Sequence, residues 1–163
     1  MLPLIRHMNV TAHPSAEWTI QQMRELTAFD HPYKSLIHDR DSIFSAQVDQ
    51  TLRDAGVRVL KPPVRSPTAN AYCERLIGTI RRDCLGYFIP INERHLRRTV
   101  KEFAVHYNRG RPHSSLGPGI PESSQAEIPA RLRTHQLPEG HRVMSIPVLG
   151  GLHHEYGLQK TAA

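Results

Sequence analysis

Cysteine and long apolar runs are both scarce in this sequence of 163 residues. Only Cys73 and Cys84 are present, with no Cys-x-x-Cys pair, which argues against a disulfide framework and a cysteine-rich zinc site. The same scarcity of cysteine favours a reducing, cytosolic setting.

No apolar run approaches the roughly 18 residues of a membrane span. The opening apolar stretch breaks at Arg6 and is too short for a secretory signal. We therefore expect no membrane partner.

Acidic residues are also outnumbered, because 15 of them face 21 basic residues and leave a formal net charge of +6. The surplus is concentrated in residues 53–111, which hold 13 basic and 5 acidic side chains, a net of +8. Residues 1–52 carry −2 and residues 112–163 are neutral. A concentrated basic segment indicates a polyanion partner such as nucleic acid. A solvated charged surface gives the same pattern, so charge alone leaves both interpretations open.

The first 60 residues alternate between short apolar runs and helical periodicity. Apolar residues recur at helical spacing over residues 15–29, which predicts a helix there. Ser45 is a suitable N-cap for a second helix, and Gly56 a suitable C-terminal stop. Short apolar runs predict three strands, over residues 4–10, 33–38 and 57–60.

Two amphipathic helices are predicted in the basic segment. Over residues 71–85 a single apolar stripe places both cysteines in the core and leaves Glu74 on the other side. Asn92 can cap the next helix, whose polar face shows the cations Arg94, Arg97, Arg98 and Lys101. After residue 111 the chain is rich in Pro, Gly and Ser, and no long periodic element is predicted. The order of elements predicts an α/β fold.

Two acidic residues fall where a ligand site would be expected. Asp39 directly follows a predicted strand, and α/β folds commonly place ligands at the carboxyl ends of strands. Glu74 follows 35 positions later on the exposed side of a helix. Two such carboxylates can hold Mg²⁺ or Mn²⁺, which prefer oxygen ligands. The spacing alone is weak support, because most acidic residues are solvated surface groups.

Three stretches of sequence together resemble the integrase core of bacterial DDE transposases and retroviral-type integrases. They are Asp39–Phe44, Ser66–Arg75 and Tyr107–Gly117. The last contains the Tyr-Asn-x-x-Arg-Pro-His-x-x-Leu pattern of bacterial insertion-sequence transposases and is the most specific of the three. The resemblance covers about residues 4–121, whereas residues 122–163 look like a C-terminal extension of unknown role.

The resemblance implies a ribonuclease-H-like fold in which acidic residues hold two divalent metals, Mg²⁺ or Mn²⁺, for in-line attack at phosphorus. It places Asp39 at the second catalytic acid of the family and Glu74 at the third. Asn70 matches a recurrent asparagine before the glutamate helix. DNA is the implied partner, and the basic residues beside the site that could contact its phosphates are Arg75, Arg81, Arg82 and Arg111.

Two departures from the family pattern are visible in the sequence. Asp41 stands where the family usually has glycine, either as a further carboxylate near the metals or as a branch variant. The first catalytic Asp of the family has no counterpart, because no Asp precedes Asp30, which lies after the first predicted helix. We therefore expect a core that lacks its first two strands and is inactive alone. Activity would then need an N-terminal part on another polypeptide, or a homo- or hetero-oligomer.

Several alternatives remain open from the sequence. A non-catalytic nucleic-acid-binding remnant of a transposase would use the +8 segment alone. An unrelated basic α/β domain would be preferred if Asp39 and Glu74 lay far apart. The Arg111–His113 stretch could contact DNA or form a structural turn that closes the last helix. His38 could support Asp39 or be an ordinary strand residue.

Overall fold

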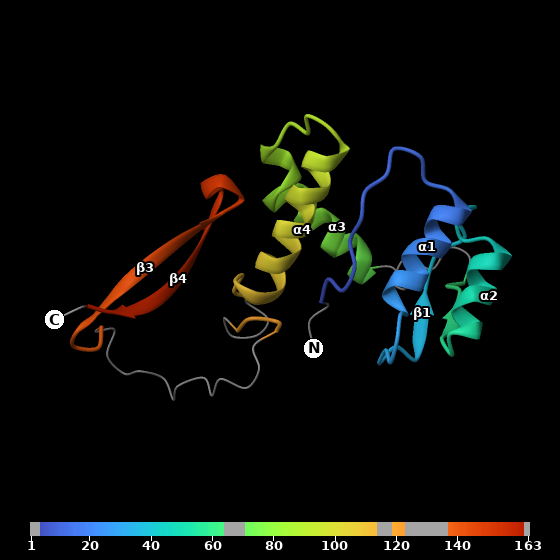
Figure 1. The fold of residues 1–163 in the computed structure, drawn as a ribbon, viewed down its shortest axis with the longest axis horizontal. Helices are drawn as coiled ribbons and strands as arrows, with labels where there is room; N and C mark the ends of the chain where they lie inside the picture. The colour runs from blue at the N-terminus through green and yellow to red at the C-terminus, as the bar shows by residue number, and fades with distance from the viewer. Residues whose placement is uncertain (1–3, 64–70, 114–118, 123–136, 162–163) are drawn as a thin grey trace.

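The computed structural model describes residues 4–63, 71–113, 119–122 and 137–161. Figure 1 shows three successive parts: a lobe of two helices and two short strands, a central pair of helices, and a projecting β-hairpin. The protein is thus a mixed α/β structure, as predicted, although each of its sheets has only two strands. In the described part of the chain no helix is both long enough and apolar enough to cross a membrane.

The first lobe follows the sequence prediction closely. Its elements are α1 (Ala16–Leu26), β1 (Ser35–Ile37), α2 (Ala46–Asp54) and β2 (Arg58–Leu60). The Ser45 side chain caps α2 by accepting a hydrogen bond from the Val48 amide, as predicted. Gly56 adopts φ +79°, which lets the chain turn straight from α2 into β2. A core of apolar side chains from α1, α2 and the start of β2 closes the lobe: Ile20, Val48, Leu52 and Val57.

The lobe contains a parallel sheet of only two strands. Leu36 of β1 lies opposite Val59 of β2, with three residue pairs in register. The third strand predicted, over residues 4–10, is wrong, because this segment has no regular secondary structure. The Asn108 side chain takes the place of a neighbouring strand there. It accepts a hydrogen bond from the Ile5 amide (3.0 Å) and donates one to the Ile5 carbonyl (2.9 Å).

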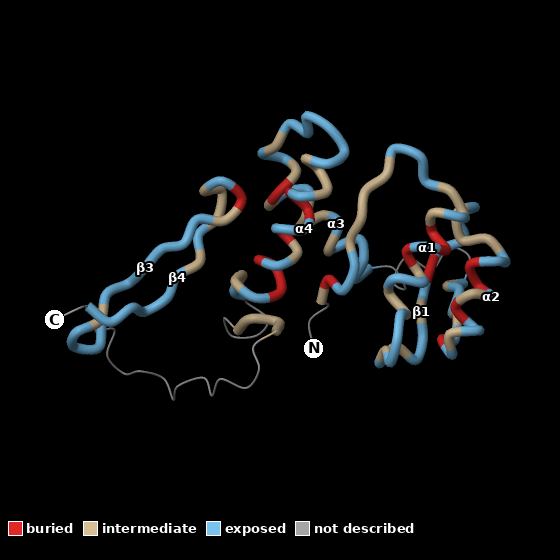
Figure 2. The backbone as a smooth tube through the Cα atoms, viewed as in Figure 1, coloured by how far each residue is buried: buried red, intermediate tan, exposed pale blue. Residues whose placement is uncertain are grey.

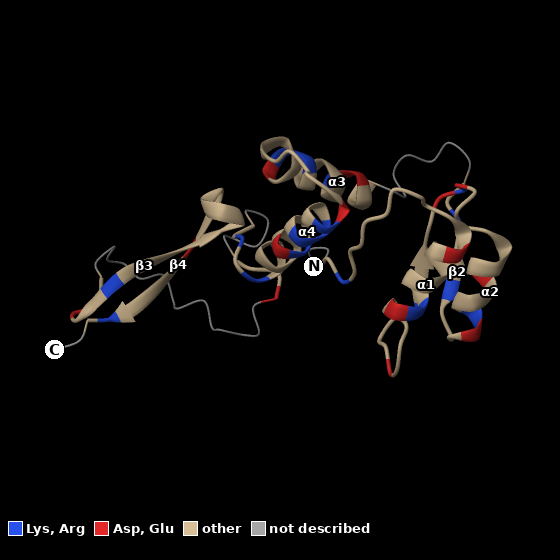
Figure 3. Ribbon diagram, turned by 45° about the horizontal axis from the view of Figure 1, so that its top comes forward, with Lys and Arg blue, Asp and Glu red and all other residues tan. Residues whose placement is uncertain are grey.

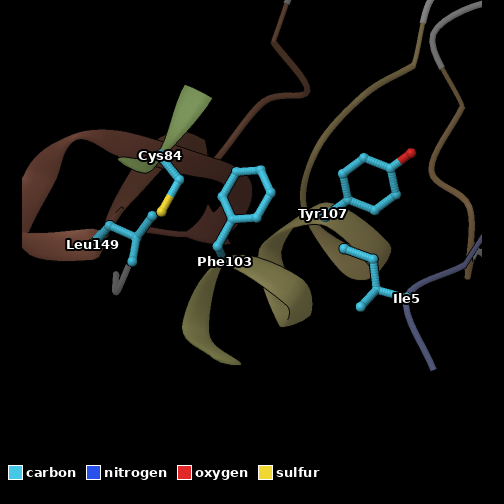
Figure 4. Close-up of a cluster of buried hydrophobic side chains, with 5 residues drawn as sticks. All are labelled: Ile5, Cys84, Phe103, Tyr107 and Leu149. Carbon is cyan, nitrogen blue, oxygen red and sulfur yellow. The ribbon is translucent and has the colours of Figure 1, made fainter. Parts of the chain in front are cut away.

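The central part is formed by α3 (Ala71–Asp83), the short 3₁₀ helix η2 (Leu85–Tyr87) and α4 (Glu93–Arg109). Asn92 caps α4 as predicted, by accepting a hydrogen bond from the His95 amide. Figure 2 shows buried positions recurring along α4. The second core gathers around this helix from distant parts of the chain (Figure 4); its buried members are Ile5, Cys84, Phe103, Tyr107 and Leu149.

The apolar stripe predicted for α3 is only partly buried. Cys84, just beyond the helix, is fully buried, as predicted. Cys73 is exposed, so its predicted place in the core is wrong. Ile77 is 50% exposed, and α3 contains no buried residue at all. Leu76 and Ile80 of the stripe pack against the second core, whereas Cys73 and Ile77 do not belong to it.

A β-hairpin lies where no long element was predicted. It consists of β3 (His141–Val148) and β4 (His153–Lys160), paired antiparallel and joined through the 3₁₀ turn η4 (Leu149–Gly151). Two glycines in the turn adopt positive φ, +67° at Gly150 and +95° at Gly151. A Gly-Gly pair between apolar runs is a recognised turn signal, and this signal could have revealed the hairpin.

The hairpin docks onto α4 by its turn end. Leu149 enters the second core, and its amide donates a hydrogen bond to the Glu102 carboxylate (2.6 Å). The His106 ring hydrogen-bonds Glu155 (2.8 Å) and stacks on the His153 ring, with centroids 5.0 Å apart. The Glu155 carboxylate lies against the bare backbone of Gly110, where a Cβ atom would collide with it.

Candidate metal and nucleic-acid site

Asp39 lies at the carboxyl end of β1, as predicted, although the strand ends at Ile37 and His38 stands between them. Its side chain is exposed, and one carboxylate oxygen accepts a hydrogen bond from the Asp41 amide (3.2 Å). Asp41 repeats the arrangement by accepting from the Ile43 amide (3.0 Å). The two carboxylates therefore stabilise successive turns of the loop that leads to α2. This gives Asp41 a structural use that the sequence did not indicate.

A cluster of polar side chains around the buried His38 contacts the backbone of Asp39. The His38 ring contacts the Asp39 carbonyl through Nδ1 (2.6 Å) and the Asp49 carboxylate through Nε2 (2.8 Å). It also stacks on the Phe44 ring at 4.4 Å. Lys61, just after β2, forms an ion pair with the second oxygen of Asp49 (2.7 Å). His38 is therefore buried and joins the loop of Asp39 to helix α2.

Asp49 is a buried carboxylate that the sequence analysis missed. Burial by itself raises the pKa of its carboxyl, but the hydrogen bonds from Lys61 and His38 outweigh burial, so the pKa lies below its ordinary value. Asp49 is consequently ionised at neutral pH. The only signal in the sequence is its place beside Val48 on the core face of α2.

Glu74 lies in the first turn of α3 with its side chain exposed, as predicted. The basic residues of the same helix, Arg75, Arg81 and Arg82, are exposed too. None of the three forms an ion pair with another residue that the structure describes. Asn70 lies outside the described residues. Acidic and basic positions both occur along α3 (Figure 3).

The carboxylates have the oxygen chemistry that Mg²⁺ and Mn²⁺ prefer, but they do not assemble into a site. Within residues 4–63, 71–113, 119–122 and 137–161, no three Asp, Glu, His or Cys side chains converge in a way that could hold a metal ion. Asp39 belongs to the first lobe and Glu74 to the central helices (Figure 1). The described residues therefore do not fit a bound metal pair as they stand.

Arg111 is half-buried and His113 is buried, and contacts within the protein hold both side chains. The Arg111 guanidinium donates to the Asp83 carboxylate at the end of α3 (2.8 Å) and lies over the Tyr107 ring, 5.9 Å from its centroid. His113 is buried, with its ring edge-on to Tyr107 at 4.7 Å. Burial lowers the pKa of His113, although its contact with the Tyr107 carbonyl opposes this shift. The stretch therefore closes α4 as a structural turn, one of the two roles considered from the sequence.

The Tyr-Asn-x-x-Arg-Pro-His motif thus connects three parts of the molecule. Asn108 holds the N-terminal segment through Ile5, Arg111 holds the end of α3, and the Asn108 carbonyl accepts a hydrogen bond from the Glu122 amide (2.9 Å). The motif is visible in the sequence, but the hydrogen bonds of Asn108 to the N-terminal segment were not predicted from it. A contact between Arg111 and DNA stays a prediction.

Comparison with known proteins bears on the same part of the chain. Residues 55–121 match the family model of the integrase core domain. The chain is also 38% identical over 71 residues to the insertion element IS476 uncharacterized 39.2 kDa protein of Xanthomonas euvesicatoria. That match covers 44% of this chain and 19% of the relative, so the chain matches about a fifth of its length. Residues 55–121, which match the integrase core domain family, contain Glu74 and the motif that closes α4.

Proposed function

We propose that this chain is a catalytic-core segment of a DDE-type transposase or integrase and acts in DNA transposition by binding DNA. The observation that carries the proposal is the integrase core match over residues 55–121, which contain Glu74 and the +8 charge surplus almost entirely. In this proposal residues 1–121 are a partial core and residues 122–163 an extension. The protein works on the DNA of a bacterial mobile element at the nucleoid.

The proposed fold is ribonuclease-H-like without its first two strands. Supporting it, β1 and β2 are parallel and joined through α2, with Asp39 at the carboxyl end of β1. Glu74 follows on the next helix, in the order that the family uses. Both faces of a parallel sheet are normally covered, yet Ile37 at the end of β1 is 52% exposed. This exposure is what a sheet without its central strand would leave.

Asp39 and Glu74 are proposed as two ligands of Mg²⁺ or Mn²⁺, which would supply the charge that phosphoryl transfer at DNA requires. Since no three such side chains converge among the described residues, we propose that the chain alone does not catalyse strand transfer. Catalysis would need a further carboxylate from a partner, such as a second copy or a separate N-terminal part. Alone, the chain would bind DNA through its basic segment.

A nicking assay on supercoiled plasmid with Mg²⁺ or Mn²⁺ tests this function. We expect the full chain to bind the plasmid and to leave it unnicked with either metal. Glu74→Gln should bind at least as well, because it removes one exposed negative charge and no ion pair or hydrogen bond with another described residue. Metal-dependent nicking by the wild-type chain that Glu74→Gln abolishes would show instead a complete catalytic site. Absence of DNA binding would remove the support for both versions.

The second candidate function is a non-catalytic DNA-binding remnant of a transposase. The net charge of +8 over residues 53–111 favours it without any appeal to the carboxylates. The two functions differ in whether a second polypeptide that supplies a carboxylate can confer metal-dependent nicking. If a polypeptide supplying a further carboxylate confers metal-dependent nicking that requires Glu74, the chain is part of an enzyme. If no such partner does so, binding alone is its function.

A further inference from the structure

The outward face of α4 carries a row of cations that neither the family resemblance nor the site above uses. Arg94, Arg98 and Lys101 follow at i, i+4 and i+7, so they lie on one side of the helix. All three are exposed. The opposite side of α4 packs into the second core through Phe103 and Tyr107. The row, which we call the α4 stripe, therefore faces solvent along its whole length.

The carboxylates that could neutralise the α4 stripe are engaged elsewhere. Glu93 pairs with Arg97, one position away from the stripe. Glu102 accepts the hydrogen bond from the Leu149 amide. Glu122 pairs with Arg109 (2.7 Å) at the far end of the helix. In the described part of the chain the three stripe cations consequently have no carboxylate partner.

Three hollows follow one another along the same face of α4. Their volumes are about 310, 460 and 420 Å³. Arg94 and Arg98 line both the first and the second, whereas Lys101 and Val105 line both the second and the third. The hollows therefore lie next to one another along the helix, and we call them the track; Glu102 also lines the second hollow and Glu122 the third. At 1.5 Å per residue, a helix of 17 residues gives the track a length of about 25 Å.

We infer that the α4 stripe and its track bind the phosphate backbone of duplex DNA. Like charges at i, i+4 repel one another and weakly destabilise a helix, and an anion bound along the row would relieve this repulsion. The planar guanidinium groups of Arg94 and Arg98 suit bidentate contacts with phosphate. Contacts of this kind position DNA without reading its sequence.

This inference rests on the proposed function, since it names where on the chain the DNA lies. It differs from the prediction that phosphates meet Arg75, Arg81 and Arg82 of α3. Each helix carries two acidic residues, but α3 holds three basic residues whereas α4 holds five, counting Lys and Arg. The α4 stripe should therefore contribute at least as much binding as the α3 arginines.

Binding of the full chain to a fluorescein-labelled duplex of about 30 base pairs, measured between roughly 50 and 200 mM salt, tests the inference. The test variant is Arg94→Gln/Arg98→Gln/Lys101→Gln. One comparison variant carries Arg75→Gln/Arg81→Gln/Arg82→Gln on α3. The matched control, Arg24→Gln/Lys34→Gln/Lys160→Gln, removes the same charge from three exposed positions elsewhere. Circular dichroism would verify that each variant is folded.

We expect the α4 variant to raise Kd roughly tenfold or more and to reduce the salt slope by about 3, because each lost phosphate contact reduces it by about 1. The control should change the slope by less than about 1. Arg94→Lys/Arg98→Lys keeps the charge and should retain the wild-type slope.

The outcomes separate the inference from the proposed function. If the α4 variant binds like the control, the inference is wrong although DNA binding stands. If only the α3 variant loses binding, the phosphates lie on α3, and the inference is again wrong. If the wild-type chain shows no salt-dependent binding to the duplex, the proposed function itself fails.

Discussion

The two hydrophobic cores of this protein differ in how far along the chain their residues are drawn. The first core, around Val48 and Leu52, is formed entirely by residues 16–60. The second brings together Ile5, Phe103 and Leu149, which lie in three separate segments. The contrast separates what local patterns determine from what only distant segments can supply. A core of neighbouring segments can form on its own, whereas the second depends on all three segments being present.

The largest expected effect is on the second core. Phe103 is fully buried there, so Phe103→Ala should cost about 3–5 kcal/mol of unfolding free energy. Hydrogen exchange should show the loss in α4 and the hairpin, with α1 and α2 nearly unchanged. Leu52→Ala is the matched change in the first core, and its loss should appear in α1 and α2. Equal loss of protection in both regions from either variant would mean that the two cores unfold as one unit.

Asn108→Ala tests how the second core depends on distant segments, because it removes the hydrogen bonds between α4 and the N-terminal segment. The variant leaves the buried Ile5 amide and carbonyl without their partner, which should cost about 1–3 kcal/mol. Faster exchange of the Ile5 amide is the direct measurement. Asn108→Asp keeps the acceptor for that amide but turns a carboxylate oxygen toward the Ile5 carbonyl, so the Ile5 amide should exchange more slowly than in Asn108→Ala although stability is not restored. Equally fast exchange of the Ile5 amide in both variants would contradict the role of this contact.

The pH dependence of stability should distinguish the first core. The folded pKa of Asp49 is lowered, so its ionised form stabilises the lobe fully above the ordinary value of 3.8. That contribution, roughly 1 kcal/mol, is lost as the pH falls through the lowered value. Urea unfolding at neutral pH and in acid should show a smaller acid loss for Asp49→Asn than for the wild-type chain. An identical acid loss in the two proteins would assign the effect to other carboxyls.

The smallest effect on stability is expected from modifying Cys73. This thiol is exposed, whereas burial raises the pKa of Cys84 to about 11. Iodoacetamide should therefore label Cys73 in the native protein and Cys84 only after unfolding. Mass spectrometry identifies the site, and labelled protein should keep its unfolding free energy within about 0.5 kcal/mol. Labelling of Cys84 at native rates would place it outside the second core.

The sequence predicted the locally determined parts of this fold well. The caps at Ser45 and Asn92 and the core face of α4 follow from spacing alone, because a helix places its own residues. The strand over residues 4–10 was wrong, since an apolar run forms a strand only beside a partner strand. Here the partner is the single side chain of Asn108. The hairpin was missed because nearly every residue of β3 is exposed, which removes the alternation that identifies a strand.

The candidate site was predictable in its residues and not in its surroundings. Asp39 and Glu74 lie on the elements expected of them, because an element's end and face are local properties. The buried Asp49 and the ion pair between Arg111 and Asp83 join segments 10 or more positions apart. Periodicity carries no information on such pairs. Periodicity equally does not predict whether carboxylates from distant segments converge on a metal.

The hairpin contacts α4 near its turn, so a small rotation there would move the far ends of its strands by a larger distance. Its strands of eight residues, each rising about 3.3 Å, extend roughly 26 Å from that attachment. A rotation of about 10° at the turn would therefore displace the far end by 4–5 Å, by the geometry of an arm of that length. Small changes in tilt at the end of α4, such as a ligand along that helix could produce, would be amplified into movements of several ångströms at His141 and Lys160.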